Sequence, residues 1–174
     1  MGVSGCGKTS IGTAFAGEIG APFIDGDDLH PAANVAKMAR GEALDDSDRY
    51  PWLARVADTL RAAEGPVVIG CSALKRRYRD WIREGAGAPV TFLHLTGSRE
   101  VIAERMAARQ GHFMPVTLLD SQFSDLEPPG PDEAAVTVDI EQPFERIVAE
   151  LLTRACPKKV DTTFSVRIRD KTKI

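Results

Sequence analysis

The order of apolar and polar positions along the chain predicts strands that alternate with helices. Short apolar runs of strand length, typical of buried parallel strands, occupy 21–25, 66–71, 90–95 and 136–139. Apolar residues recur at helical spacing in segments at about 8–19, 31–41, 51–63, 72–84, 99–108 and 143–155. This alternation indicates an α/β fold, in which a parallel sheet has helices on both faces.

Two segments lack a clear pattern. Residues 109–131 have weak periodicity and are rich in glycine, proline and polar residues, so we expect a mobile lid there. The tail at 157–174 differs from the rest: residues 163–169 alternate polar and apolar positions, which fits either an edge strand or a disordered tail. We therefore expect one domain over 1–156, followed by a tail of uncertain structure.

Composition narrows the functional classes. The chain has 174 residues, 43% of them hydrophobic and 27% charged, which is typical of a single soluble domain. A net charge of −3 argues against nucleic acid as a partner, and no apolar run approaches the roughly 20 residues that span a bilayer. Three cysteines without metal spacing indicate reduced thiols and a cytoplasmic location.

The chain begins with a phosphate-binding motif. Residues 2–9 fit the pattern G-x-x-x-x-G-K-[ST], whose backbone N–H groups wrap the phosphates of a nucleotide. Lys8 can reach the β- and γ-phosphates, and the Thr9 hydroxyl can bind Mg²⁺. The alternative is a glycine-rich turn with a chance lysine. We expect ATP to be bound by Gly2, Val3, Ser4, Gly5, Cys6, Gly7, Lys8 and Thr9.

Two carboxylates follow the first predicted strand. Asp25 and Asp27 lie at its carboxyl end, where open α/β sheets bind ligands. By position we expect Asp27 to accept the proton of a substrate hydroxyl, and Asp25 to hold a water molecule of the Mg²⁺ shell. A solvated acidic turn is the alternative.

Several cations are candidates for binding an anionic substrate: Arg49, Lys75, Arg76 and Arg79. Arg77 fits a solvated helix face. Arg105 and Arg109 are four residues apart on one helix face that points into the expected lid, where one could reach the triphosphate. His30 and His112 could hydrogen-bond a polyol, although a lone histidine is more often structural.

Several longer segments carry a family resemblance. They are residues 2–9, Phe-Ile-Asp-Gly-Asp-Asp-Leu-His-Pro at 23–31, Gly-Glu-Ala-Leu-Asp-Asp at 41–46, Asp-Arg-Tyr-Pro-Trp-Leu at 48–53, Cys-Ser-Ala-Leu-Lys at 71–75 and Arg-Gln-Gly-His-Phe at 109–113. Over residues 1 to about 155 the chain resembles the gluconate kinases (gluconokinases). The acidic segment and the Cys-Ser-Ala-Leu-Lys segment are more specific than the phosphate loop, which many NTPases share.

The resemblance implies ATP-dependent phosphorylation of D-gluconate to 6-phosphogluconate, with ATP and Mg²⁺ as cofactors. It implies a three-layer P-loop kinase fold similar to shikimate kinase, with a parallel sheet, substrate-covering helices at about 30–64, a lid at about 109–131, and a homodimer. By the same resemblance Asp27 is the catalytic base, Arg109 is the lid arginine, and Arg49, Lys75 and Arg79 hold gluconate. From the residues themselves we also expect Lys8 and Arg109 to be catalytic, Arg105 and Arg109 to contact ATP, and His30 to contact the substrate beside Asp27.

One departure concerns the start of the chain. Members of the resembled family have a central strand before the phosphate loop, whereas only Met1 precedes Gly2 here. We expect the natural protein to begin upstream; a weaker alternative places residues 163–169 in that position. Two other functions stay open: a kinase for another sugar acid or polyol, or a nucleotide-binding remnant impaired by the missing strand.

Overall fold

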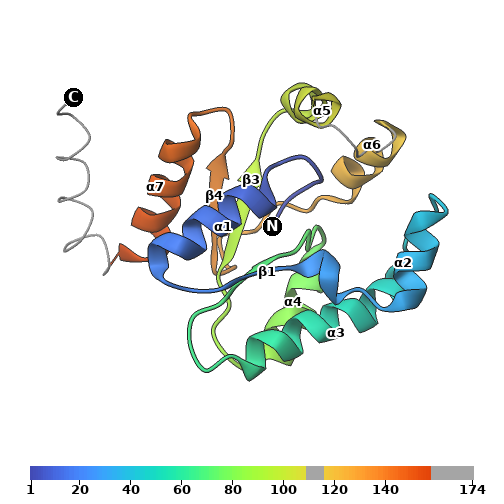
Figure 1. Cartoon of the computed structure of the whole chain (residues 1–174), viewed down its shortest axis with the longest axis horizontal. Coiled ribbons are helices and arrows are strands. Elements are labelled where there is room, and N and C mark those ends of the chain that lie inside the picture. The colour runs from blue at the N-terminus through green and yellow to red at the C-terminus, as the bar shows by residue number, and fades with distance from the viewer. Residues whose placement is uncertain (109–115, 158–174) are drawn as a thin grey trace.

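The computed structural model describes residues 1–108 and 116–157 (Figure 1). Its strands are β1 Phe23–Asp25, β2 Val68–Gly70, β3 Phe92–Thr96 and β4 Ala135–Asp139. The helices are α1 Lys8–Ile19, the 3₁₀ turn η1 Gly26–Leu29, α2 Ala32–Ala39, α3 Asp46–Ala62, α4 Arg76–Ala86, α5 Arg99–Ala107, α6 Val116–Asp125 and α7 Phe144–Ala155. Among the described residues no helix is long and apolar enough to cross a membrane.

The strands form two separate parallel pairs. β1 pairs with β2, from Phe23 opposite Val68 to Asp25 opposite Gly70. β3 pairs with β4, from Phe92 opposite Ala135 to Thr96 opposite Asp139. The parallel pairing confirms the α/β prediction, and each pair is joined by a crossover that contains helices.

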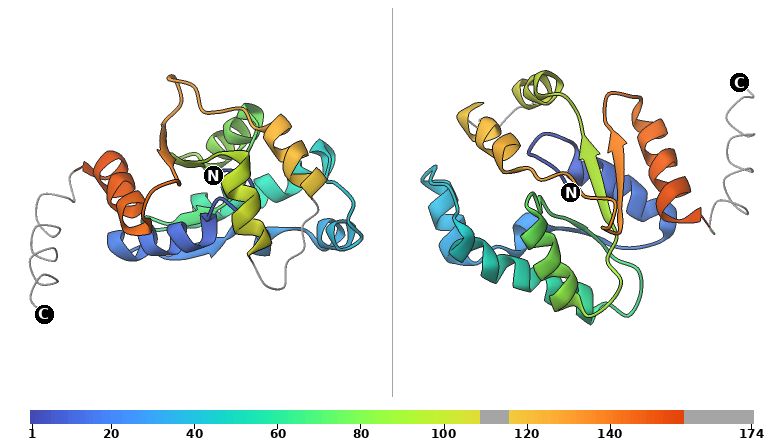
Figure 2. Two further views of the ribbon diagram at one scale, coloured as in Figure 1. Left: turned by 90° about the horizontal axis from the view of Figure 1, so that it is seen from above. Right: turned by 180° about the vertical axis from the view of Figure 1, so that it is seen from behind.

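Helices cover both faces of the strands. Successive side chains of a strand point to opposite faces, so Leu95 packs in one core cluster with α1 and α7, while Phe92 packs in another with α3 and α4. In the right-hand view of Figure 2, α1 and α7 lie in the upper part of the molecule, and α3 and α4 lie in the lower part. The result is a three-layer arrangement of helix, sheet and helix.

The gap between β2 and β3 is crossed, among the described residues, by Met1 and Gly2. The Met1 ammonium donates to the Leu93 carbonyl, and the Met1 carbonyl accepts from the Leu95 N–H at 3.0 Å. On the other side, the Gly2 N–H donates to the Ser72 carbonyl at 3.1 Å. These bonds link β3 to the residue two positions after the end of β2. Burial lowers the pKa of the Met1 ammonium to about 6.

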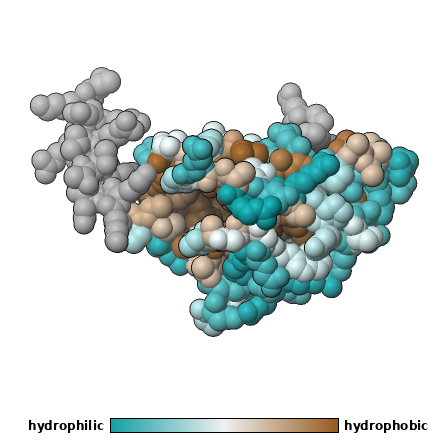
Figure 3. Space-filling view, turned by 90° about the horizontal axis from the view of Figure 1, so that it is seen from below, coloured by the Kyte–Doolittle hydropathy of each residue, from teal (hydrophilic) through white to brown (hydrophobic). Residues whose placement is uncertain are grey.

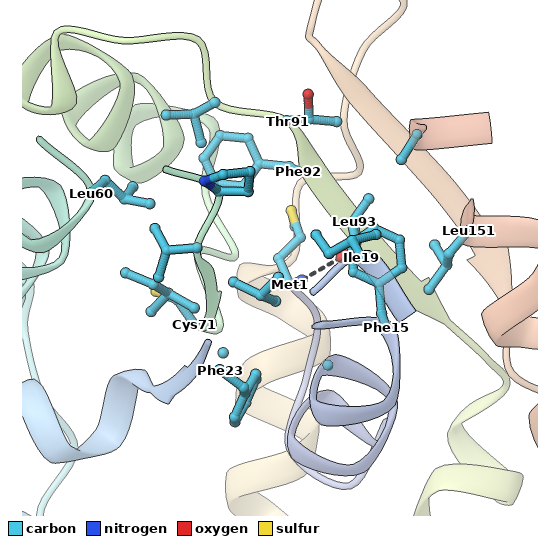
Figure 4. Close-up of a pocket in the computed structure, with 18 of the residues that line it drawn as sticks. Met1, Phe15, Ile19, Phe23, Leu60, Cys71, Thr91, Phe92, Leu93 and Leu151 are labelled. Atoms are coloured by element: carbon cyan, nitrogen blue, oxygen red, sulfur yellow. Dashed lines mark hydrogen bonds between the residues drawn. The ribbon is translucent and has the colours of Figure 1, made fainter. Parts of the chain in front are cut away.

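An apolar cavity of about 420 Å³ occupies the rest of this gap. Its walls come from β2, β3, α1, α3 and α7, and Met1, Phe15, Phe23, Cys71 and Leu93 point towards it (Figure 4). Seen from below, the surface is hollowed and apolar side chains gather around the hollow (Figure 3). The suggestion that residues 163–169 fill this space lies outside the described residues.

We predict that filling this cavity with a strand stabilises the protein. An added apolar, β-branched segment of about five residues before Met1, the length of β3, offers backbone partners to the facing edges of β2 and β3. Each buried Val or Ile contributes roughly 1.5–3 kcal/mol before the entropy of ordering is subtracted, so thermal unfolding should shift upwards by several degrees. A Gly/Ser segment of equal length is the control, and equal melting temperatures would contradict the prediction.

The helix boundaries agree in part with the sequence. The predicted bounds of α1 are confirmed. Ser98 caps α5, and its hydroxyl accepts from the Val101 N–H at 3.4 Å. α3 begins at Asp46, earlier than predicted, because Asp45 and Asp48 form a reciprocal capping box. Pro51 then lies inside this helix, where it removes one backbone donor.

Candidate active site

The phosphate loop wraps around its own lysine. Gly7 has φ +94° and precedes α1, and a Cβ on Gly2 would lie 2.6 Å from the Leu95 carbonyl oxygen. Lys8 Nζ donates to the Gly2 and Val3 carbonyls at 3.1 and 3.0 Å. The loop therefore gathers an ammonium group and the N-terminus of a 12-residue helix at one point, which suits an anionic phosphate chain.

A residue outside the loop holds it in place. Gln122 of α6 accepts from the Ser4 N–H at 2.7 Å through its side-chain oxygen, and its amide donates to the Ser4 hydroxyl at 3.1 Å. No local pattern places Gln122 at this loop, because Gln122 lies 118 residues from Ser4 in a segment without clear periodicity. α6 therefore connects the segment expected to be a lid with the phosphate loop.

Thr9 and Asp25 meet at the mouth of the loop. The Thr9 hydroxyl donates to Asp25 Oδ2 at 3.0 Å, while Asp25 Oδ1 accepts from the Asp27 N–H at 3.1 Å. One hydroxyl and one carboxylate are oxygen donors of the kind that Mg²⁺ uses together with water and phosphate oxygens. The donor set fits that cation, and the described residues contain no cluster of three or more His, Cys, Asp or Glu that would hold a metal by protein ligands alone.

The turn after β1 carries Asp27 out of the sheet. Gly26 packs so tightly that a Cβ would lie 2.3 Å from the Gly70 carbonyl oxygen, and its own carbonyl accepts from Trp52 Nε1 at 2.7 Å. Asp27, the next residue, has a side chain that is 86% exposed. Burial raises the pKa of the Cys71 thiol to about 11. The Asp27 carboxylate is thus exposed for ligand binding, while the backbone before it is held by the packing of Gly26.

His30 lies beside Asp27. Its ring stacks on Trp52, with centroids 4.3 Å apart, and its side chain is only 5% exposed. Nε2 lies 4.0 Å from Asp27 Oδ1, and Nδ1 lies 3.3 Å from the Asn34 amide nitrogen. In this structure His30 contacts Trp52, Asp27 and Asn34. Its contact with the substrate stays a prediction.

Arg49 and Lys75 converge on one carboxylate. Lys75 Nζ lies 2.9 Å from Asp125 Oδ1, and Arg49 Nη1 lies 3.9 Å from Asp125 Oδ2. Both cations also lie over the Tyr78 ring, at 5.9 and 5.6 Å from its centroid. The hydrogen bond to Asp125 raises the pKa of Lys75, which keeps this group charged. The structure therefore brings together two of the cations that the sequence proposed.

Asp125 and Tyr78 are site residues that sequence reasoning missed. The Tyr78 hydroxyl accepts from Arg49 Nη1 at 3.1 Å and donates to Asp46 Oδ1 at 2.5 Å, a bond that lowers the pKa of Asp46. Tyr78 thereby fixes the direction of Arg49. No periodicity marks Asp125, which ends α6 and reaches this cluster only through tertiary packing.

Arg79, expected to contact the substrate, lies inside the protein. Its side chain has 0% exposure and makes a two-pronged contact with Glu133, with both N–O distances 2.7 Å. Its third nitrogen donates to the Ala73, Leu74 and Glu127 carbonyls at 3.2, 3.0 and 3.0 Å. All three guanidinium nitrogens therefore donate to protein acceptors, and in this structure Arg79 holds the loop before α4; its substrate contact stays a prediction.

The remaining cations have different surroundings. Arg76 pairs with Asp132 and Arg77 with Asp46, both at the surface. Arg105 donates to the Ile140 carbonyl at 2.8 Å, and its contact with ATP stays a prediction. Arg109 and His112 lie outside the described residues, as do residues 109–115 of the expected lid and the tail from 158.

The fold and the loop together define a P-loop kinase. Residues 1–129 match the protein family described as an AAA domain. A shikimate kinase from Bacteroides thetaiotaomicron has the same fold, with a TM-score of 0.62 at 18% identity over 89% of this chain and 95% of that chain. The three-layer P-loop kinase fold expected from the sequence is confirmed.

Proteins of higher sequence identity show which family of P-loop kinases this chain belongs to. The gluconokinase of Gluconobacter oxydans is 47% identical over 87% of this chain and 86% of its own length. The thermoresistant gluconokinase of Escherichia coli is 46% identical over 87% and 89%. A gluconokinase structure from Sinorhizobium meliloti superposes with a TM-score of 0.84 at 45% identity, covering 99% of this chain and 94% of that one. This chain belongs to the gluconokinase family.

Proposed function

We propose that this protein transfers the γ-phosphoryl group of ATP to a terminal hydroxyl of D-gluconate, forming 6-phospho-D-gluconate and ADP. Membership of the gluconokinase family supports this function. The observation that carries it is the cluster of Arg49 and Lys75 around a carboxylate, because a sugar acid presents the same group as Asp125. The competing functions, a different polyol kinase or an inactive remnant, have no comparable support.

The chemistry follows from the positions of the charged groups. The hydroxyl oxygen of gluconate attacks the γ-phosphorus in line, the bond from that phosphorus to the β,γ-bridging oxygen breaks, and ADP leaves with the electron pair. Asp27 accepts the proton of the hydroxyl, since its exposed carboxylate stands at the carboxyl end of β1. Lys8 and the loop N–H groups offset the charge that develops on the phosphate oxygens.

Thr9 and Asp25 would hold Mg²⁺, with Asp25 acting through a water molecule. When bound, the cation neutralises phosphate charge and orients the β- and γ-phosphates. The Thr9–Asp25 hydrogen bond keeps both oxygens on the same side of the loop. Arg105, in α5 before the lid, and Arg109, at the start of the lid at about 109–131, are proposed as contacts to ATP. The helices at about 30–64 are proposed to cover the substrate.

A coupled assay that follows ADP formation tests the function. Turnover with D-gluconate, and little with shikimate, glycerate or nucleoside monophosphates, is the expected result. Activity confined to another acceptor would contradict gluconate as the substrate, and ATP binding without transfer to any acceptor would favour the remnant. A homodimer and a cytoplasmic location stay predictions that the family resemblance supports.

Replacing Arg49 by alanine should weaken the binding of gluconate more than it slows the chemistry. A charge-assisted hydrogen bond to a carboxylate contributes roughly 1.5–3 kcal/mol, so we expect KM for gluconate to rise about 10- to 100-fold, with a smaller change in kcat. Arg55→Ala, on the same helix with an exposed side chain, is the matched control. A large fall in kcat with unchanged KM would show that Arg49 acts on the transferred phosphoryl group instead.

A further inference from the structure

The orientation of the Asn34 side chain can be assigned from its neighbours. Asn34 is buried, with 4% exposure, and its Nδ2 donates to the Asp48 carbonyl oxygen at 2.8 Å. A backbone carbonyl only accepts hydrogen bonds, so the amide must present its NH₂ group to it. A flipped amide would place two acceptor oxygens against each other in a buried site, which is unfavourable.

This orientation determines what His30 Nδ1 must do. The same Asn34 NH₂ group lies 3.3 Å from His30 Nδ1. Because Asn34 offers a donor there, Nδ1 must accept and therefore carries a lone pair. In a neutral imidazole the proton is then on Nε2.

The surroundings of the ring favour its neutral form. Burial is the largest effect and lowers the pKa of His30; the charge of Arg49 on α3 acts in the same direction, while Asp27 opposes both. The flat face of the ring stacks on Trp52, with an interplanar angle of 15°, which fixes the ring plane. A protonated ring would also place an N–H at Nδ1 against the Asn34 donor.

We propose that Asn34 is a positioning residue that holds His30 in its Nε2–H form, so that the ring presents a proton donor to the carboxylate of Asp27. The two groups already face each other, with Nε2 4.0 Å from Asp27 Oδ1. This inference rests on the proposed function in one respect, that Asp27 is the base.

The arrangement has a chemical consequence for the base. The Nε2–H points a proton donor, and not an acceptor, at the carboxylate that is proposed to take the proton of the substrate hydroxyl. A ring nitrogen that already holds a proton has no lone pair for a second one. The proton that Asp27 takes from the substrate therefore stays on the carboxyl group until it leaves to solvent, and His30 does not relay it.

The tautomer is measured directly by NMR of the full chain without substrates. Long-range ¹H–¹⁵N correlation of the imidazole rings distinguishes a protonated from an unprotonated ring nitrogen, and the His30→Gln spectrum identifies the His30 signals. Protonated Nε2 with unprotonated Nδ1 is the expected result; protonated Nδ1 would overturn the proposal. Asn34→Leu, which cannot donate, should give a mixture of both forms. This measurement does not depend on turnover, so it is separate from any failure of the proposed function.

The importance of the donor is measured by kcat/KM for gluconate. His30→Leu removes the donor, so kcat/KM should fall by roughly 3- to 10-fold. His30→Gln, which keeps an N–H near the position of Nε2, should recover part of this loss. Val35→Ala, at the exposed neighbour of Asn34, is the control. An unchanged kcat/KM in His30→Leu would overturn the positioning role.

Discussion

Replacing Asp27 by asparagine is expected to lower kcat by about 100- to 10,000-fold while ATP still binds. Asparagine has nearly the same shape but cannot take a proton, and loss of a general base has an effect of this size. The loop that binds the nucleotide is unaffected, because its contacts come from Gly2, Lys8 and Gln122. Steady-state kinetics with gluconate, together with titration of ATP, measure the two effects separately.

The neighbouring carboxylate provides the control for this experiment. Asp28 is also exposed and adjacent in sequence, so Asp28→Asn changes the local charge equally. It should leave kcat within a few-fold of the original value. If Asp27→Asn retains near-normal kcat, the carboxylate is not the base and the proposed mechanism fails at that step.

Replacing Arg79 by methionine is expected to destabilise the fold by about 3–5 kcal/mol. This change leaves the Glu133 carboxylate, which is 2% exposed, with Arg83 as its remaining cation at 3.0 Å. Breaking a buried ion pair by removing one partner carries a cost of this size, and three backbone carbonyls lose their donor as well. Urea denaturation followed by circular dichroism measures the loss.

Two further variants identify the cause of this loss. Arg76→Ala, at an exposed ion pair on the same helix, should cost no more than about 1 kcal/mol. Arg79→Met combined with Glu133→Leu should recover part of the stability, since both charges are then removed from the core. An Arg79→Met protein with unchanged stability but a raised KM for gluconate would contradict this structural role and support Arg79 as a substrate contact.

The buried ion pair of Arg79 and Glu133 predicts how the free energy of unfolding depends on pH. Hydrogen bonds from Arg79 are the largest cause that lowers the pKa of Glu133 from 4.5 to about 2. A carboxylate whose folded-state pKa is depressed stabilises the fold fully above its unfolded pKa. Its contribution is then lost progressively between pH 4.5 and about 2. The free energy of unfolding should fall more steeply over this range in the original protein than in the Arg79→Met, Glu133→Leu double variant.

Local patterns were enough to predict the phosphate loop and several elements. α1 begins after Gly7 and ends before Gly20, and Ser98 caps α5. Glycine conformation and helix capping both depend on only a few adjacent residues, so a local pattern can predict them. The start of α3 was wrong because the acidic cluster before Pro51 looked like a turn, whereas Asp45 and Asp48 cap a helix. The helix α6 was missed because 109–131 has little periodicity.

Arg79 shows a signal that the sequence contained. It lies three residues before Ile82 and seven before Ala86, both buried, so helical spacing places it on the inward face of α4. Lys75 precedes that helix with an extended backbone, and its side chain lies against Asp125. The family resemblance gives both cations one role, but the helix boundary between them directs their side chains to different places: Lys75 to Asp125 and Arg79 to Glu133.

By itself the sequence determined the α/β class, the phosphate-loop motif and the position of Asp25 and Asp27 at the end of the first strand. Each of these depends on residue types at fixed short spacing. Only the tertiary structure decided that Asp125 joins Arg49 and Lys75, that Gln122 holds the loop, and that Asn34 faces His30. These contacts join residues from separate helices and loops. Their partners are selected by how the helices pack on the strands, which no local pattern records.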